Sequence, residues 1–234
     1  MLSRSSMKTK IKTGIKSEEW LHFSWAFLDV AEFSCDFWLN AVKKREYSGK
    51  TSVRSYLAII FNIKHSLELF LKRCIVSYTG NLDKKDYGHD LESFYEKFLQ
   101  IDFQKIQTAI KSKPESLREN HPLFVARHIL SKPKSLQKKV DTLGDLVDRY
   151  YHLRFSRNFK KVGIILRDVE NTAFRYPENS LAVDIDYLDL IERISFADFN
   201  DLREDITLLT WCYSNLGFVI RQYEGVLQSK VKPL

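Results

Sequence analysis

Apolar residues recur every three or four positions over long stretches of this sequence, a spacing that places them on one side of an α-helix. Only 8 glycines and 5 prolines occur among 234 residues, and so few turn-forming residues favour long helices over many short strands. The sequence therefore predicts one soluble, all-α domain, a bundle of four to five long helices with short extra helices and a small strand pair.

The periodic stretches predict long helices over residues 20–47, 52–78, 135–155 and 199–228. The apolar residues of the first are Trp20, Phe23, Phe27, Val30, Ala31, Ser34, Phe37, Trp38 and Ala41. Those of the second are Ile60, Ile63, Leu67, Phe70, Leu71 and Cys74. We expect Ser17 to cap the first helix and Gly80 to end the second, and Asp90 to cap a further helix over residues 91–99.

The remaining segments are less regular. Pro114, Pro122 and Pro133 interrupt residues 101–133, which predicts an elaborated connection with one or two short helices. Residues 162–166 fit either a short strand or a buried helical turn, and residues 181–185 fit a short edge strand. The predicted domain spans residues 17–228, between a basic, disordered tail at 1–16 and a C-terminal tail at 229–234.

The net charge of +7 is unevenly distributed. Residues 1–16 contain five basic residues and no acidic one, so the rest of the chain is close to neutral. Net charge is therefore no guide to the partners of the domain.

The sequence has no apolar stretch long enough for a signal peptide or a membrane span, so we expect a cytoplasmic protein without membrane contact. Its three cysteines do not have the spacing of a metal site or a disulfide framework, so we expect free thiols and no metal. Without a dinucleotide or phosphate-loop motif, no cofactor is expected.

Polar residues form a second stripe on the helix predicted at 52–78: Lys64, His65, Glu68 and Lys72. The simplest interpretation is a solvated ladder of pairs four residues apart, since a metal site here needs a further ligand that the sequence does not identify. His89 precedes the capping Asp90 and could contact the Glu68 carboxylate. A catalytic interpretation would use His65, His89 and Arg175.

Basic and aromatic residues are interleaved between Arg149 and Arg175. The basic members include Arg149, Arg154, Arg157, Lys160 and Lys161. Arginines beside aromatic rings can neutralise phosphates and stack on bases, which favours a single-stranded RNA surface. A charged surface over an aromatic core explains the same pattern equally well.

Two short motifs occur in succession: Asn62-Ile63-Lys64-His65-Ser66-Leu67-Glu68-Leu69-Phe70-Leu71-Lys72 and Gly88-His89-Asp90-Leu91. Together with the later Phe174-Arg175-Tyr176-Pro177, they resemble motifs of the HEPN superfamily, over residues 53–100 most clearly. The resemblance implies a bundle of four or five helices that forms a homodimer. It also implies a place among metal-independent ribonucleases of toxin–antitoxin and antiviral defence systems.

The catalytic motif of that family is an arginine followed, after four to six residues, by a histidine, and this sequence lacks it. Arg118 and Arg149 each precede a histidine by too short a spacing, and the last predicted helix contains Arg203 but no histidine. The sequence therefore favours a non-catalytic HEPN-like module that binds RNA, a nucleotide or a partner protein in a prokaryotic defence or stress system. A divergent metal-independent endoribonuclease and a helical scaffold without a nucleic-acid role are the alternatives.

Overall fold

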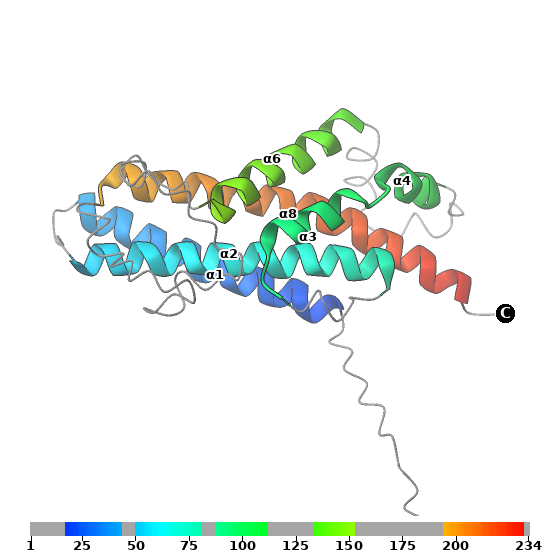
Figure 1. Ribbon diagram of the computed structural model, residues 1–234, viewed down its shortest axis with the longest axis horizontal. Helices are drawn as coiled ribbons and strands as arrows, with labels where there is room; N and C mark the ends of the chain where they lie inside the picture. Colours follow the sequence, from blue (N-terminus) through cyan, green and yellow to red (C-terminus); the bar gives the residue numbers. More distant parts are fainter. Residues whose placement is uncertain (1–16, 44–49, 81–87, 112–132, 153–193, 232–234) are drawn as a thin grey trace, which may run out of the picture.

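The computed structural model describes residues 17–43, 50–80, 88–111, 133–152 and 194–231. They form six helices and contain no strand: α1 (Ser17–Lys43), α2 (Lys50–Thr79), α3 (Leu91–Leu99), α4 (Phe103–Lys111), α6 (Pro133–Tyr151) and α8 (Phe196–Val231) (Figure 1). The all-α prediction is thus confirmed for this part of the chain. The strands expected at 162–166 and 181–185 and the tail at 1–16 lie outside the described residues, and the predicted C-terminal tail starts too early because α8 continues to Val231.

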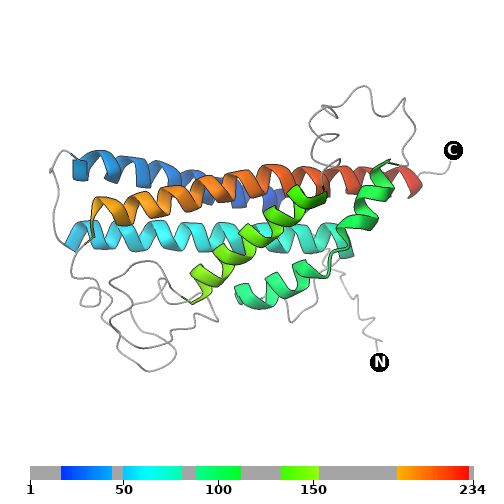
Figure 2. The same ribbon diagram turned by 90° about the horizontal axis from the view of Figure 1, so that it is seen from above.

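Three long helices, α1, α2 and α8, run side by side along the length of the molecule (Figure 2). Helix α6 crosses α8 obliquely, and the short helices α3 and α4 lie towards the end of the bundle where α8 finishes (Figures 1 and 2). Helix α2 contacts α1, α3, α6 and α8, and α8 contacts α1, α2, α4 and α6, so these two helices form the centre of the bundle. The apolar stripe predicted for α2 is buried throughout, and α8 buries Ile206, Leu209, Leu216 and Val219 in the same core.

A buried hydrogen-bonded junction joins the three long helices. The Ser66 hydroxyl of α2 donates to the backbone oxygen of Ser24 in α1 at 2.7 Å, and lies 3.0 Å from the Tyr213 hydroxyl of α8. The Tyr213 ring stacks on Phe70 with 4.0 Å between the ring centroids. Small serine side chains let the helix backbones approach closely here, while the hydrogen bonds satisfy polar groups that have lost contact with water.

Local sequence signals explain several helix ends. The Asp90 side chain accepts hydrogen bonds from the backbone N–H groups of Glu92 and Ser93, as expected for the N-cap of α3. Gly80 has a φ of 78°, a left-handed conformation that glycine adopts without strain, and its N–H bonds to the Val76 oxygen at the end of α2. Pro133 is the first residue of α6. Proline suits this position because the N–H group of the first helical residue has no partner within the helix.

Helix α1 differs from its predicted orientation. Leu21, Leu28, Cys35 and Trp38 face the core, whereas Phe23, Val30 and Phe37 of the predicted apolar stripe are 57%, 52% and 51% exposed. Phe33, which lies outside the predicted stripe, is 77% exposed. Together with the exposed Ala26, these four residues form what we call the outer face of α1. The prediction of a single inward apolar face on α1 was therefore wrong, because this helix is apolar on two sides.

Ion pairs connect α8 to three other helices: Arg73 of α2 pairs with Glu224, Arg149 of α6 with Asp205, and Arg203 of α8 with Glu32 and Asp36 of α1. Arg73 of α2 donates to both carboxylate oxygens of Glu224 at 2.7 Å each, and the Arg73 side chain is only 2% exposed. Asp205 accepts hydrogen bonds from Arg149 and from the Tyr150 hydroxyl of α6. Burial raises the pKa of the Asp205 carboxyl, and its bonds to Arg149 and Tyr150 offset part of this effect.

All three cysteines are free, in agreement with the expected free thiols, and all three are buried. They lie on the three long helices: Cys35 on α1, Cys74 on α2 and Cys212 on α8. Burial raises the pKa of each thiol to about 12, so the reactive thiolate is scarce at neutral pH in the folded protein.

Gly144 allows α3 and α6 to pack closely. The Tyr95 hydroxyl of α3 donates to the Val140 oxygen at 3.0 Å, and a Cβ atom at position 144 would lie 2.8 Å from Cζ of the Tyr95 ring. We therefore expect Gly144→Ala to lower the free energy of unfolding by about 1–3 kcal/mol, the usual cost of overpacking. Urea denaturation of both proteins measures the difference, and a stabilised variant would contradict this account of the contact.

Candidate polar site between α2 and α3

The Glu68 carboxylate is the centre of a buried polar cluster. Glu68 is 1% exposed and accepts a hydrogen bond from Nζ of Lys72, one turn further along α2, at 2.7 Å. Nδ1 of His89 lies 3.0 Å from both carboxylate oxygens. Because His89 belongs to the segment just before α3, its contact with Glu68 connects this segment to α2.

Lys72 makes a second connection between the same two segments. Its Nζ donates to the backbone oxygen of Gly88 at 2.8 Å, and lies 4.7 Å from the ring centroid of Phe94 in α3. On the other side, the Trp20 ring of α1 lies 6.0 Å away. The ammonium group is thus held by a carboxylate, a carbonyl and two aromatic faces, which compensates for its removal from water.

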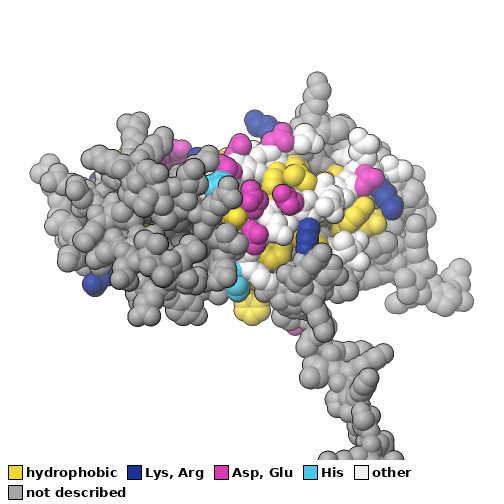
Figure 3. Space-filling model, viewed as in Figure 1, with side chains coloured by type: hydrophobic (Ala, Val, Ile, Leu, Met, Phe, Trp, Pro, Cys, Tyr) yellow, Lys and Arg dark blue, Asp and Glu magenta, His cyan; other side chains and the backbone are white. Residues whose placement is uncertain are grey.

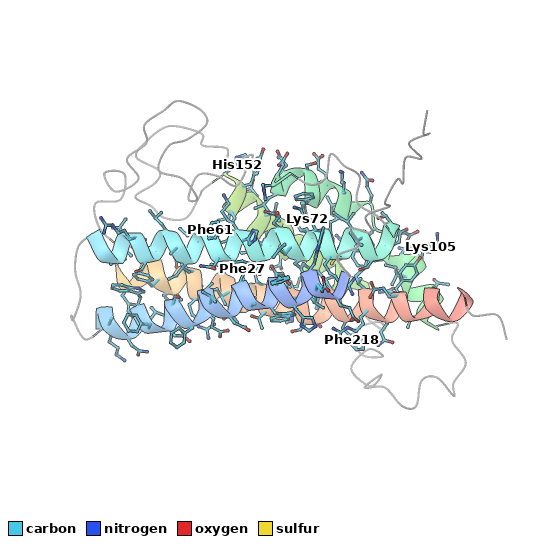
Figure 4. All side chains as sticks on the ribbon, turned by 90° about the horizontal axis from the view of Figure 1, so that it is seen from below. Phe27, Phe61, Lys72, Lys105, His152 and Phe218 are labelled. Atoms are coloured by element: carbon cyan, nitrogen blue, oxygen red, sulfur yellow. The ribbon has the colours of Figure 1, made fainter. Side chains whose placement is uncertain are left out.

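His65 is adjacent to the cluster and packs among aromatic rings. Its ring lies edge-on to Phe27 of α1, with centroids 4.4 Å apart, and stacks on Phe61 (Figure 4). Nδ1 of His65 is 3.6 Å from the nearer Glu68 oxygen, which is too long for a hydrogen bond. His65 therefore contributes packing and a polar neighbour to the cluster.

The cluster keeps Glu68 ionised. Burial raises the pKa of the Glu68 carboxyl, but neighbouring His65, Lys72 and His89 together lower it by more, so that the pKa lies far below its ordinary value. An ionised carboxylate is consistent with the short bond to Lys72. Glu68 thus acts as a permanent hydrogen-bond acceptor at neutral pH.

This pKa shift predicts a dependence of stability on pH. A carboxyl whose pKa is lowered by folding stabilises the protein above its ordinary pKa, here 4.5, and this contribution is lost as the pH falls further. The difference in free energy of unfolding between the wild type and Glu68→Leu should therefore shrink when urea denaturation is repeated at about pH 3. A difference that stays constant with pH would show that Glu68 carries no such shift.

The structure corrects the prediction of a solvated ladder. Exposed fractions are 0% for Lys64, 1% for Glu68 and 6% for Lys72, because α1 and the segment leading into α3 cover this side of α2. The expected contact between His89 and Glu68 is confirmed, whereas Asp90 serves as the cap of α3. Arg154, Arg157, Lys160, Lys161 and Arg175 lie outside the described residues, so their roles stay predictions.

The geometry resembles part of an acid–base site. A carboxylate that binds one nitrogen of an imidazole fixes the ring and its tautomer, and the His89 side chain is 35% exposed. Lys72 and His65, the other basic residues beside Glu68, face inward: Lys72 is 6% exposed, and the His65 side chain is 16% exposed. In the part of the chain that the structure describes, no three His, Cys, Asp or Glu side chains are placed to hold a metal ion.

The described part of the chain has a small excess of acidic residues. It includes 16 lysines and arginines against 18 aspartates and glutamates, although the whole chain carries +7. Acidic side chains gather near the middle of the face shown in Figure 3, and α3 and α6 expose Glu92, Glu96, Asp141, Asp145 and Asp148. Arg149, a predicted RNA contact, is paired with Asp205. This surface gives a nucleic acid few basic contacts.

None of the helices within the described ranges is long and apolar enough to cross a membrane. Comparison with known proteins gave no matching family model, no similar curated protein and no similar solved structure.

Proposed function

We propose that the protein is a non-catalytic HEPN-like module that works by binding a protein partner. The outer face of α1 is the observation that supports this most directly. Large exposed apolar surfaces on a folded domain are typical of protein-binding sites, and here four large apolar side chains on one helix are each at least half exposed.

The burial of Glu68 and Lys72, and their bonds within the protein, support a role without catalysis. Glu68 and Lys72 bind each other and the segment before α3, which is a structural use of both charges. RNA cleavage by acid–base chemistry needs both a proton acceptor and a proton donor at the reacting phosphate. The arginine and histidine that supply these functions in the resembled family are missing at the required spacing.

The charge of the described residues gives no support to RNA binding by this part of the chain. Binding of RNA depends on basic groups that neutralise phosphates, and the described helices carry a small excess of acidic residues. A role in a prokaryotic defence or stress system belongs to the same proposal and rests on the HEPN resemblance alone.

A photo-crosslinking amino acid at position 33 tests this proposal in cells that naturally make the protein. Position 99 provides the matched control, because Leu99 is 52% exposed on α3. We expect a crosslinked protein adduct from position 33 and none from position 99. Crosslinking at neither position, or equally at both, would contradict protein binding through α1.

A divergent ribonuclease is the second candidate, and the Glu68–His89 pair is the observation in its favour. Purified protein should be incubated with single-stranded RNA in the presence of a metal chelator, together with His89→Ala and a control, His22→Ala, which changes an exposed histidine of α1. We expect no cleavage by any of the three proteins. Cleavage by the wild type and His22→Ala, but not by His89→Ala, would establish the ribonuclease instead.

A further inference from the structure

The outer face of α1 has the pattern of a seam between two helices. Phe23, Val30 and Phe37 are seven residues apart, with Ala26 and Phe33 between them, and all five residues are exposed. Two helices pack along a common line through residues that alternate at this three- and four-residue spacing. The seam extends over about 21 Å at 1.5 Å per residue, or four helical turns. A helix is therefore the element that fits this face.

One flank of the seam is acidic. Asp29 and Asp36 each come directly before a residue of the seam, on the side of α1 that contacts α8. Asp36 lies 2.8 Å from the Arg203 guanidinium of α8, but the same guanidinium also pairs with Glu32 at 2.6 Å. Two carboxylates thus share one cation, and Asp29 adds a third negative charge at an exposed position. The flank therefore keeps a negative charge that a partner can use.

We infer that the outer face of α1 binds one amphipathic helix of another protein, with lysine or arginine along the edge that meets Asp29 and Asp36. The inference rests on the proposed function, in which this face binds protein, and names the kind of partner. Residues that flank the seam between two helices set partner choice by their charge, because opposite charges attract and like charges repel. A basic edge would offset the negative charge that α1 and α8 leave in excess.

A second copy of this chain fits the face less well. In an antiparallel pair of α1 helices with a two-fold axis near Val30, Asp29 of one copy would lie close to Asp29 of the other. In a parallel pair, the acidic flank would face Phe27, which is uncharged and packs against His65 of α2. A basic helix from a different protein avoids both arrangements.

The size of the face also fits a single helix. The exposed parts of its three phenylalanines amount to on the order of 400 Å². This is about half of what each partner buries in an interface of ordinary size between two folded proteins. A helix about 10 Å across needs no wider surface than a strip of four turns. We therefore expect a weak complex, with a dissociation constant on the order of 10 μM.

Two synthetic helical peptides test the charge of the partner. Both are about 21 residues long with leucine at the seam positions, and they differ only at the flanking positions, which are lysine in one and glutamate in the other. Fluorescence anisotropy with the purified full chain should show at least about 10-fold tighter binding of the lysine peptide, and about 0.5 M salt should reduce this preference. Equal affinities, or no binding of the lysine peptide at up to about 200 μM, would overturn the inference.

Variants of the chain show where the lysine peptide binds. Phe33→Gln should weaken binding at least about 10-fold by removing an apolar contact, whereas Leu99→Gln on α3 should leave it unchanged. Asp29→Lys should weaken binding by a similar factor through repulsion, whereas Glu96→Lys, also on α3, should not. Circular dichroism checks that the variants remain folded, as expected for exposed side chains. Equal effects within either pair of variants would overturn the inference.

Crosslinks in cells separate this inference from the proposed function. Photo-crosslinking amino acids at positions 26, 33 and 37 should label one basic, helical segment of a single partner, as identified by mass spectrometry. Labels spread over several segments, or an adduct of twice the mass of the chain, would overturn the inference while leaving protein binding through α1 intact. Crosslinking at none of these positions would contradict the proposed function and the inference with it.

Discussion

Replacing Glu68 by leucine should lower the free energy of unfolding by about 3–5 kcal/mol, the usual cost of breaking a buried ion pair. Stability is lost because the Lys72 side chain is only 8% exposed, so its ammonium group would stay buried without its carboxylate partner. Its remaining contacts, the Gly88 oxygen and the aromatic rings, carry no full negative charge. Urea denaturation at neutral pH measures the loss.

A double variant separates this explanation from a simple packing defect. Glu68→Leu with Lys72→Met removes both charges and keeps the volume, and such replacements of buried pairs are often neutral or stabilising. We therefore expect the double variant to recover most of the stability. Glu96→Leu, which changes an exposed glutamate of α3, should have little effect. A double variant as unstable as Glu68→Leu would show that the stranded charge is not the cause.

Replacing Glu224 by leucine should have an effect of similar size, about 3–5 kcal/mol, for the same physical reason at a different place. The Arg73 guanidinium would remain in the interior, where its side chain is 2% exposed and its Nε already lacks a partner among the described residues. Thermal unfolding should show a clearly lower midpoint than that of the wild type.

Glu204→Leu is the matched control, since it changes an exposed glutamate of the same helix α8. Adding Arg73→Met to Glu224→Leu should restore part of the lost stability. Equal midpoints for Glu224→Leu and Glu204→Leu would indicate that solvent replaces the carboxylate at Arg73 without cost.

The sequence predicted the helices well because their signals are local. Asp90 and Gly80 mark helix ends through their own conformations and hydrogen bonds, and the apolar periods of α2 and α8 lie within each helix. Which side of α1 packs against the core could not be predicted from such local signals. A helix that is apolar on two sides has two possible inward faces, and only the position of its neighbours decides between them.

The candidate site was predictable in its members but not in its environment. Lys64, Glu68 and Lys72 have the same spacing in an exposed ladder as in a buried cluster, so their burial depends on α1 and α3 packing over them. The ion pair of Arg73 and Glu224 joins residues 151 positions apart, and no local pattern indicates it. Sequence periodicity contains no information about such long-range partners.

The bonds around α3 also imply an order in which the chain folds. Lys72 and Gly88 are 16 residues apart and Glu68 and His89 are 21 apart, whereas Arg73 and Glu224 are separated by 151. Closing a short loop costs less chain entropy than closing a long one, and contacts between nearby residues form faster. The α2–α3 unit should therefore assemble early around Glu68, and α8 should dock onto an already formed pair of helices.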